Sequence, residues 1–476
     1  MKQTNKRKPR RHDPVLIALI IAIFVLIGID GGIAGYILSH REALPTQSSQ
    51  AQDKSQATAE GKDANADDST SKDSGKDTDE NKSTDTDEGS KADADGSDEP
   101  EDDDEDTSGP TSVKVMMIGD VLMHNELVES GLQADGSYNF DFIFEHIKSY
   151  IDDADLRILN QETVMGEPER GYYWTWGAAG PIMNTPTSLA DTEVKYGFNL
   201  ILKAHNHTLD LGYSGLAHEL DYWKANFPEM PVIGVNNPNA KDGDDSQNWV
   251  DNVYVYECNG MKIAVLNYTY ATNENVDWNT DVTYVSYMSP EKIHEDVQKA
   301  RDQGAEMIIA CPHWGIQYTT TPSDEEYYYS KVFCDEGVDV IFGCHPHILQ
   351  RVEMLQNAEG HRTVCYYSMS NFVAAGTMGT DMMMGGIAQC TMVRNADGTY
   401  EVDDVHLVPT CTCYTVGPNM SAWPLSDWTY DLAAQSYRNA LTPDYVRNFC
   451  SNLFGPGFDT ETGVYTLDTK GDAREV

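Results

Sequence analysis

The feature that most constrains this chain is the tract of residues 41–112, which contains no aromatic residue and almost no aliphatic one. Asp, Ser, Thr, Lys, Ala, Gly, Glu and Gln make up nearly all of it. Such a segment cannot bury enough apolar surface to offset the entropy lost on folding, so we expect it to be disordered. We therefore predict a disordered acidic linker over 39–112, between an N-terminal segment and a C-terminal folded part.

The three parts differ in charge. The whole chain carries −44, of which residues 1–50 contribute +4, residues 51–110 contribute −16 and the remainder −32. The acid excess argues against nucleic acid as a partner, because a phosphate backbone would be repelled. Repulsion within the tract would extend it, which suits a spacer between membrane and domain. An arm that binds cations or the cell wall is the alternative.

An apolar run from Val15 to Leu38 follows a basic segment, residues 1–14. Its 24 residues are enough to span a bilayer as a helix. Basic residues before the run predict that 1–14 is cytoplasmic and that everything after 38 is outside the cell. We therefore expect a single-pass signal anchor in the cell membrane and an extracellular C-terminal domain. A cleaved signal peptide is the alternative, although Gly32-Ile33-Ala34 is a poor cleavage site.

From Val113 onward, short apolar runs alternate with helical patterns, which is typical of an α/β or layered αββα domain. Strands are predicted at 113–118, 156–159, 199–204, 262–269, 306–311, 338–343 and 363–368. Helices are predicted at 140–153, 185–196, 214–226, 289–303, 324–336 and 443–454. The helix at 289–303 has the clearest boundaries, because Ser289 can cap it, Pro290 suits its first turn and Gly304 ends it.

Polar residues that can bind metals follow most of these strands. In open α/β sheets the residues just beyond the carboxyl ends of strands meet in a crevice where ligands bind. Carboxylates, an amide and several imidazoles gathered there would suit one or two divalent cations, with a bridging carboxylate where two are bound. The residues are Asp120 and His124, Asn160 and Glu162, His205, Asn206 and His207, His313, His345 and His347, and Asn371.

Each of these residues also has a structural interpretation. A Gly-Asp pair after a strand is usually a turn, and a single histidine at a strand end is usually a hydrogen-bonded core residue. The functional hypothesis depends on their occurrence at successive strand ends. The nine cysteines are an odd number, and several fall in predicted buried strands, where free cysteine packs as a small apolar residue. Cys344 as a soft metal ligand is a further alternative.

The ordered motifs resemble the bacterial capsule synthesis protein CapA family, which is related to poly-γ-glutamate capsule proteins and lies within the calcineurin-like metallophosphoesterase superfamily. The resemblance covers about 113–410, which we take as the domain, with 411–476 as a C-terminal extension packed on it. It implies a layered αββα fold. The motifs are MIGDVLMHN (117–125), LNQETVMG (159–166), YGFNLILKAHNHTLDLG (196–212), PHWGIQY (312–318), FGCHPHILQRVE (342–353) and YSMSNF (367–372).

The resemblance also implies roles for individual residues. His207 is similar to a histidine that lies beside the metals and donates a proton to the leaving oxygen. Glu162 resembles a bridging carboxylate. The implied metal ligands are Asp120, Glu162, Asn206, His313, His345 and His347, and the metals would be Mn, Zn or Fe.

The chain departs from the family pattern at three positions. Gln161 stands where the family commonly has leucine, His205 where it commonly has asparagine, and Leu122 where the superfamily's Asp-x-His pair has histidine. His124 or His205 would have to complete the metal position that this last change leaves short of ligands. The number of metals, two, one or none, therefore stays open at this point.

The resemblance implies a membrane-anchored protein that takes part in making, attaching or trimming an anionic surface polymer such as poly-γ-glutamate. If it is an enzyme, the chemistry would be metal-dependent hydrolysis or transfer. Two alternatives remain: a non-catalytic subunit that holds a capsule synthase or exporter in place, and a metallophosphoesterase that acts on another surface substrate. Its partners would be the membrane and either the polymer or other capsule synthesis subunits.

Overall fold

The structure is a computed structural model. It describes residues 111–476 except 167–170, 172–174, 177–180, 240–252, 274–283, 376–378, 414, 416–419 and 437–438. The predicted signal anchor at 15–38 and the predicted linker at 39–112 lie outside these residues. Among the helices that are described, none is long and apolar enough to cross a bilayer.

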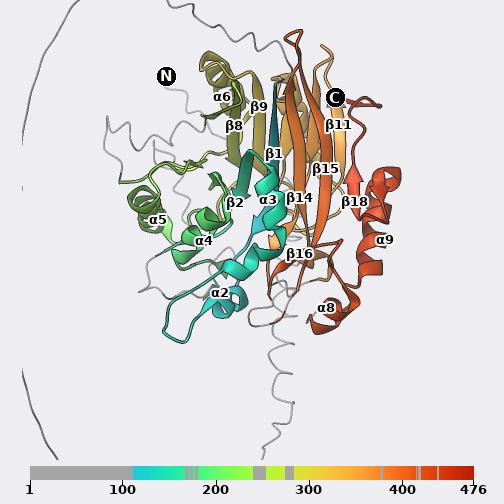
Figure 1. The fold of residues 1–476 in the computed structure, drawn as a ribbon. Helices are drawn as coiled ribbons and strands as arrows, with labels where there is room; N and C mark the ends of the chain where they lie inside the picture. Colours follow the sequence, from blue (N-terminus) through green and yellow to red (C-terminus); the bar gives the residue numbers. More distant parts are fainter. Residues whose placement is uncertain are drawn as a thin grey trace, which may run out of the picture. The chain divides into compact units, whose positions relative to one another are not determined.

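Two large β-sheets form the centre of the fold (Figure 1). One has ten strands and contains the path β17-β18-β15-β14-β1-β2-β5-β6, with β13 beside β1 and β16 beside β15. Its strands are β1 (Thr111–Val121), β2 (Leu156–Asn160), β5 (Leu200–Leu202), β6 (Val232–Ile233), β13 (Asn371–Val373), β14 (Met384–Arg394), β15 (Tyr400–Thr412), β16 (Ala422–Pro424), β17 (Phe458–Asp459) and β18 (Val464–Thr466).

The second sheet has seven strands in the order β19-β11-β12-β10-β9-β8-β7. Its strands are β7 (Val253–Cys258), β8 (Met261–Thr269), β9 (Met307–His313), β10 (Val340–Phe342), β11 (Val352–Gln356), β12 (Arg362–Tyr366) and β19 (Arg474–Glu475). A separate two-stranded ribbon joins β3 (Thr175–Trp176) to β4 (Pro181–Ile182).

The parallel strands of both sheets are joined through helices. In the ten-stranded sheet β1, β2, β5 and β6 are neighbours in chain order, and each pair is parallel. In the seven-stranded sheet β8, β9 and β10 are likewise parallel. Right-handed crossovers that proceed in one direction leave their helices on one face of a sheet. The helices are α2 (Asn125–Gly131), α3 (Lys148–Asp153), α4 (Ser188–Tyr196), α5 (Gly212–Asn226), α6 (Pro290–Asp302), α7 (Asp324–Asp335), α8 (Tyr430–Gln435) and α9 (Pro443–Phe454).

The central strands β8, β9 and β10 of the seven-stranded sheet are buried on both faces. Along β8, Ile263 and Val265 belong to the large core that includes the ten-stranded sheet, whereas Ala264 and Leu266 belong to a second core with α6 and α7. This alternation is the two-residue period of a strand, and it places α6 and α7 on the face away from the other sheet. Because the parallel strands are covered on both sides, they read as continuous apolar runs in the sequence.

The predicted parallel strands and most predicted helices are present. At α6, the Ser289 side chain accepts a hydrogen bond from the Lys292 backbone, and Pro290 occupies the first turn, as the sequence predicts. The segment 140–153 differs from the single helix expected. It forms two 3₁₀ turns (Asp141–Ile143 and Glu145–Ile147) before the short α3. Phe142, Ile143 and Phe144 are all buried, and no single helical face can bury three consecutive side chains.

Candidate metal centre

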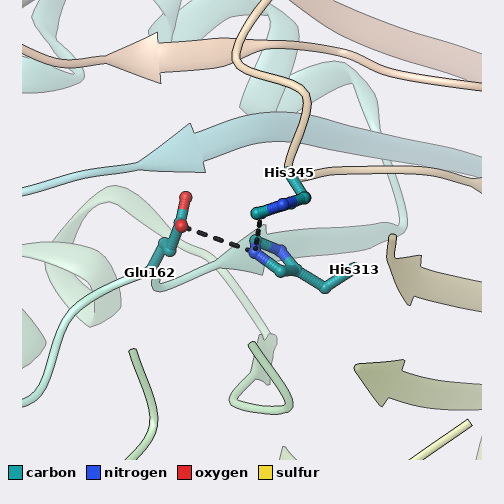
Figure 2. Close-up of side chains that lie close together, drawn as sticks. All are labelled: Glu162, His313 and His345. Atoms are coloured by element: carbon teal, nitrogen blue, oxygen red, sulfur yellow. Dashed lines mark hydrogen bonds and ion pairs between the residues drawn. The ribbon is translucent and has the colours of Figure 1, made fainter. Parts of the chain in front are cut away.

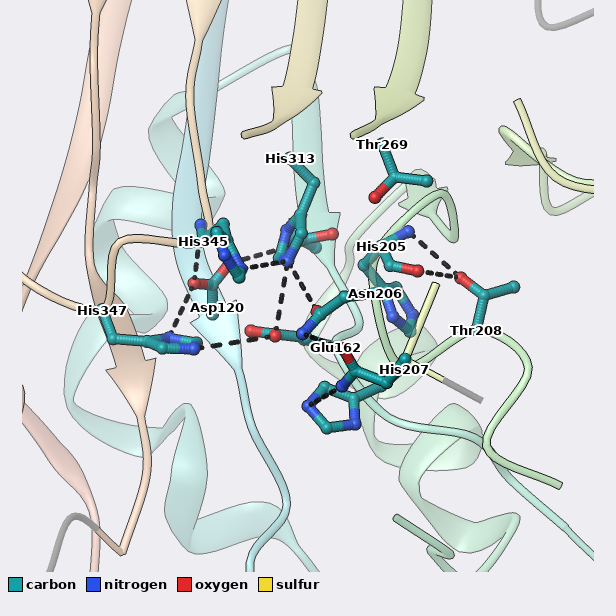
Figure 3. A network of polar contacts seen from close by, with 12 residues as sticks. Asp120, Glu162, His205, Asn206, His207, Thr208, Thr269, His313, His345 and His347 are labelled. Atoms are coloured by element: carbon teal, nitrogen blue, oxygen red, sulfur yellow. Dashed lines mark hydrogen bonds and ion pairs between the residues drawn. The ribbon is translucent and has the colours of Figure 1, made fainter. Parts of the chain in front are cut away.

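The carboxyl ends of strands from both sheets meet at one place. Asp120 lies near the end of β1, and Glu162 follows β2 by two residues. His313 is the last residue of β9, and His345 follows β10. Figure 3 shows these side chains pointing toward one another from the two sheets. All are at most 2% exposed, so the site is shielded from bulk water.

One group of potential ligands consists of Glu162, His313 and His345 (Figure 2). The Nε2 of His313 lies 3.4 Å from Oε1 of Glu162 and 3.2 Å from Nδ1 of His345. The amide oxygen of Asn206 lies 2.9 Å from the same Nε2. Three ligand atoms, one from each residue of the group, lie within 4.8 Å of one another, which is the spacing of groups that surround a single ion.

A second group consists of Asp120, Glu162 and His347. The Nδ1 of His347 lies 3.4 Å from Oδ2 of Asp120, and its Nε2 lies 3.9 Å from Oε1 of Glu162. Glu162 belongs to both groups, which is the position that a bridging carboxylate would occupy. The six residues that the family resemblance implies as ligands are thus brought together.

The polar atoms at this position fit a divalent cation. Both carboxylate oxygens of Glu162 are buried, and neither has a hydrogen-bond partner among the described residues. A buried carboxylate without donors is costly unless a cation compensates it. Carboxylate, amide and imidazole ligands together suit Mn, Zn or Fe, and they do not select one of these metals.

The backbone at the site is held in unusual conformations. His345 and His347 have φ values of 101° and 57°, in the left-handed region that L-residues rarely adopt. Gly119 and Gly343 lie very close to other backbone segments of the chain. A Cβ added at Gly119 would lie 2.2 Å from the Ser370 carbonyl oxygen, and one at Gly343 would lie 2.1 Å from the Tyr367 carbonyl oxygen. Strain of this kind collects where a site requires a particular geometry.

Asn160 and Asn371, the additional candidates, contact the predicted ligands. Asn160 Nδ2 donates to Oδ1 of Asp120 at 2.7 Å and lies 3.4 Å from Nδ1 of His313. Asn371 Oδ1 lies 2.9 Å from Nδ1 of His347. Both asparagines therefore orient a carboxylate or a ring, as the hydrogen-bond partners of metal ligands do.

His207 lies beside the ligand groups. Its Nδ1 is 2.7 Å from Oδ2 of Asp210, and Nδ2 of Asn273 lies 3.5 Å from its Nε2. Burial lowers the pKa of His207, but the negative charge and hydrogen bond of Asp210 outweigh this effect and raise it. Sequence reasoning missed Asp210 and Asn273. Asp210 stands three residues after His207 within a quoted motif, which was a usable signal, whereas Asn273 gave none.

His124 and His205 do not join either ligand group. His124 precedes α2, and its Nδ1 accepts a hydrogen bond from the Ala375 backbone at 3.1 Å. Burial lowers its pKa to about 3. His205 is fully buried, and its ring packs against that of His313 with centroids 6.0 Å apart.

Burial and neighbouring charges determine the protonation of the ligand histidines. Burial, reinforced by His313 and His347, lowers the pKa of His345 well below its ordinary value, so this ring stays neutral. A neutral imidazole is the form that binds a metal. Burial opposes the charges of both Asp120 and His347. The hydrogen bond from His347 nevertheless lowers the pKa of Asp120, and the charge of Glu162, followed by the contact with Asp120, raises the pKa of His347.

Two tyrosines flank the site on its more exposed side. The ring of Tyr270 lies 4.7 Å from that of His345, and the ring of Tyr318 lies 6.1 Å from that of His347. They are 36% and 40% exposed, in contrast to the buried ligands.

The cysteines are structural. All nine are unpaired, and eight are buried. Burial, followed by the charge of Asp120, raises the pKa of Cys344 well above its ordinary value, which keeps the thiol protonated. Cys344 belongs to neither group of candidate ligands.

The chain is similar to known bacterial capsule synthesis proteins. Residues 114–375, more than half of the chain, match the family model described as bacterial capsule synthesis protein PGA_cap. The capsule biosynthesis protein CapA of Bacillus anthracis is 26% identical over 265 residues, which cover 54% of this chain and 58% of that protein. The PGA biosynthesis protein CapA of Bacillus subtilis (strain 168) is 24% identical over 293 residues, covering 61% of this chain and 70% of that protein.

Solved structures give weaker matches. A calcineurin-like phosphoesterase from Bacillus subtilis aligns with a TM-score of 0.37 and 14% identity, covering 71% of this chain and 99% of that one. The NAD nucleotidase of Haemophilus influenzae aligns with a TM-score of 0.40 and 13% identity, covering 63% and 56%. The chain spans less than two thirds of the Bacillus anthracis relative and of the Haemophilus nucleotidase.

Proposed function

Because this chain belongs to the bacterial capsule synthesis protein family PGA_cap, we propose that it takes part in the biosynthesis of an anionic capsule polymer such as poly-γ-glutamate. Its relatives in two Bacillus species are named for capsule and PGA biosynthesis, which supports this assignment. We place the protein at the cell membrane, with the N-terminal run at 15–38 as its anchor and the folded domain outside the cell.

The observation that carries a chemical role is the buried Glu162, whose carboxylate is shared by two ligand groups and lacks hydrogen-bond donors among the described residues. Asp120, Glu162, Asn206, His313, His345 and His347 would hold one or two divalent cations. Bound there, the cations would polarise a phosphoryl or acyl oxygen of a substrate.

The chain's own groups supply the proton chemistry. Asp210 accepts from Nδ1 of His207 and fixes the orientation of the ring. The contact also favours the imidazolium, whose Nε2–H can donate a proton to a leaving oxygen. Asn160 and Asn371 orient the ligands, and the rings of Tyr270 and Tyr318 lie beside those of His345 and His347. The reaction would be hydrolysis or transfer on the surface polymer.

A non-catalytic assembly role is the second candidate. It is favoured by the near-complete burial of the ligand residues, because a closed metal site can serve structure alone. In this case the chain would hold a capsule synthase or exporter in the membrane, and its cation would stabilise the domain.

A complementation experiment separates the two. A deletion strain would receive the wild-type chain, Glu162→Gln, His345→Ala, a chain lacking 15–38, or the exposed-carboxylate control Glu401→Gln. The enzyme hypothesis expects capsule to be lost with both site variants and with the deletion. Capsule retained by Glu162→Gln and His345→Ala, but lost with the deletion, would overturn the enzyme hypothesis and favour assembly.

A further inference from the structure

A buried ion pair lies directly behind the segment that carries Glu162. The Nζ of Lys203, just after β5, is 3.0 Å from Oε1 of Glu219 on α5, and both side chains are fully buried. Charges are rarely removed from water to this extent, because desolvation is expensive unless every donor and acceptor is used. The hydrogen-bond partners of Lys203 and Glu219 therefore indicate the structural role of the ion pair.

Both partners bind the segment 161–165. Lys203 Nζ donates to the carbonyl of Gln161 at 3.3 Å and to the carbonyl of Thr163. These are the two residues on either side of Glu162. Glu219 accepts from Nε2 of Gln161 at 2.5 Å and from the backbone N–H of Met165 at 3.1 Å.

We propose that the Lys203–Glu219 ion pair is a positioning device that holds Glu162 in the orientation needed to bind its cation. Residues 161–165 form neither helix nor strand, so no regular hydrogen-bond ladder fixes them. The ion pair supplies that constraint, because it hydrogen-bonds to every second residue of the segment, namely Gln161, Thr163 and Met165. The inference rests on the proposed metal site, and it adds two positioning residues that do not touch the cation.

Lys203 also lies just before the segment 205–207, which carries the candidate ligand Asn206. Its backbone N–H and that of Ala204 donate to Oδ1 of Asn267 at 3.1 and 2.7 Å. His205, Asn206 and His207 follow immediately. The ion pair thus stands where the segments after β2 and β5 meet. Gln161, which departs from the family's usual leucine, is part of the network.

Glu219→Gln is the sharpest disruption. The carboxylate of Glu219 accepts from three donors: Lys203 Nζ, Gln161 Nε2 and Met165 N. A glutamine side chain of the same shape has one acceptor oxygen, and its NH₂ group would oppose at least one of these donors. The segment should therefore loosen although the volume is unchanged.

Glu193→Gln is a matched control. Glu193 lies on α4, is fully buried, and interacts electrostatically with both Lys203 and Glu219. Neither of its carboxylate oxygens has a hydrogen-bond partner among the described residues. Burial raises its pKa well above the ordinary value, so the neutral glutamine resembles the protonated native side chain.

The test uses the full chain and two measurements. Hydrogen–deuterium exchange in metal-free protein follows the peptide that contains 161–165, and Mn²⁺ titration followed by electron paramagnetic resonance gives affinity. We expect Glu219→Gln to raise exchange in that peptide at least tenfold and to weaken Mn²⁺ binding by roughly 10- to 100-fold. Glu193→Gln should change neither. If Glu219→Gln does not fold, Lys203→Met/Glu219→Gln, which leaves no unpaired charge, replaces it.

The outcomes are distinguishable. Unchanged exchange in 161–165 would overturn the positioning role, whether or not metal binds. Faster exchange with unaltered Mn²⁺ affinity would overturn it as well, because the constraint would then not act on the cation site. A wild-type chain that binds no Mn²⁺, Zn²⁺ or Fe²⁺ would overturn the proposed metal site and with it this inference. Metal binding by the wild type is therefore measured before any variant is compared.

Discussion

Glu162 is the side chain on which the two ligand groups depend. It lies within 3.4 Å of His313 and 3.9 Å of His347, and it is buried without hydrogen-bond donors among the described residues. Removing its charge should therefore affect both groups, whereas removing His345 should affect one.

We expect Glu162→Gln to lower the bound Mn, Zn or Fe per chain to near background, because an amide cannot bridge two cations as a carboxylate does. Elemental analysis of the purified chain measures this. Glu401→Gln, which changes an exposed carboxylate, should retain the wild-type content. Full metal content in Glu162→Gln would contradict the bridging role.

His207 allows a different prediction, because it is assigned to proton transfer. On the proposed function, His207→Gln should lower kcat about 10²- to 10⁴-fold, the usual contribution of a positioned acid, and should leave the metal content unchanged. Asp210→Asn should show a smaller loss, since the ring remains but its orientation and charge are less well supported. Turnover of a phosphoester or γ-glutamyl polymer is the measurement. A variant that loses metal instead would show that His207 is a ligand.

The sequence predicted the site residues that lie at or just after the ends of strands. It did not predict the residues elsewhere in the chain that contact these site residues. Asp120, Glu162 and His313 are each placed by a local apolar run, so their convergence could be predicted from strand ends. Asn273 approaches Asn206 and His207 across more than 60 residues of chain. No local pattern encodes such a contact.

Among the elements, β1 and β13 show how tightly the site is built. The two strands are parallel, with Asp120 opposite Asn371. Gly119 allows this approach, because a Cβ there would lie 2.2 Å from the Ser370 carbonyl and 2.7 Å from that of Met369. Backbone atoms cannot move aside as a flexible side chain can.

We expect Gly119→Ala to lower the free energy of unfolding by about 1–3 kcal/mol, the usual cost of overpacking, and to weaken metal binding by displacing Asp120. Urea denaturation and Mn²⁺ titration measure the two effects. Gly379→Ala is the control, because a Cβ at Gly379 meets no atom of the described residues within 4 Å. Equal behaviour of the two variants would show that β1 and β13 can separate without cost.

The first turn of α7 contains Glu326, a buried acid whose ionisation makes the stability of the folded chain depend on pH. Ser323 and Glu326 form a reciprocal capping box there. Burial raises the pKa of Glu326 from 4.5 to about 7, in spite of the hydrogen bonds from Ser323. The folded chain thus holds this proton more tightly than the unfolded chain, so the contribution of Glu326 to stability is greatest below about pH 4.5 and is lost as the pH rises through 7.

Glu326→Gln should remove that decline, because glutamine keeps the capping box and does not ionise. Between pH 5 and 8 the wild type should lose about 1–3 kcal/mol relative to this variant. Urea unfolding at several pH values measures the difference. Asp324→Asn, an exposed carboxylate of the same turn, should retain the wild-type slope. Parallel profiles for wild type and Glu326→Gln would contradict the assignment.

Element prediction succeeded for the parallel strands and failed for several antiparallel ones. Strands such as β9, up to its terminal His313, and β10 are apolar because both faces are covered, and this run is visible in the sequence. β14 begins with Met384, Gly385 and Gly386, which weakens its strand signal. The structure explains one of these glycines, since a Cβ at Gly385 would lie 2.0 Å from the Asn371 carbonyl.

At the scale of the whole molecule, charge and proposed substrate oppose each other. The part of the chain after residue 110 carries −32, and an anionic polymer would be repelled over long distances. Only local cations at the site would reverse the sign of the interaction.

We therefore expect poly-γ-glutamate to bind the full chain more tightly at 150 mM than at 10 mM NaCl, because the screening length falls from ~30 Å to ~8 Å. Sedimentation or fluorescence anisotropy with labelled polymer, in the presence of Mn²⁺, measures this dependence. Binding that weakens as salt increases would mean that attractive surface contacts dominate, and it would contradict the charge argument.

The ligands come from both sheets, and this has a thermodynamic consequence. Asp120 lies in β1 and Glu162 follows β2, which are strands of the ten-stranded sheet. His313 ends β9 and His345 follows β10, which are strands of the seven-stranded sheet. A cation bound by Glu162, His313 and His345 would be a cross-link between the two halves of the core. Its binding free energy would then be added to the work of separating the sheets, so metal loading and sheet separation would be linked equilibria. A chelator should loosen the whole molecule along this seam before it unfolds any single element.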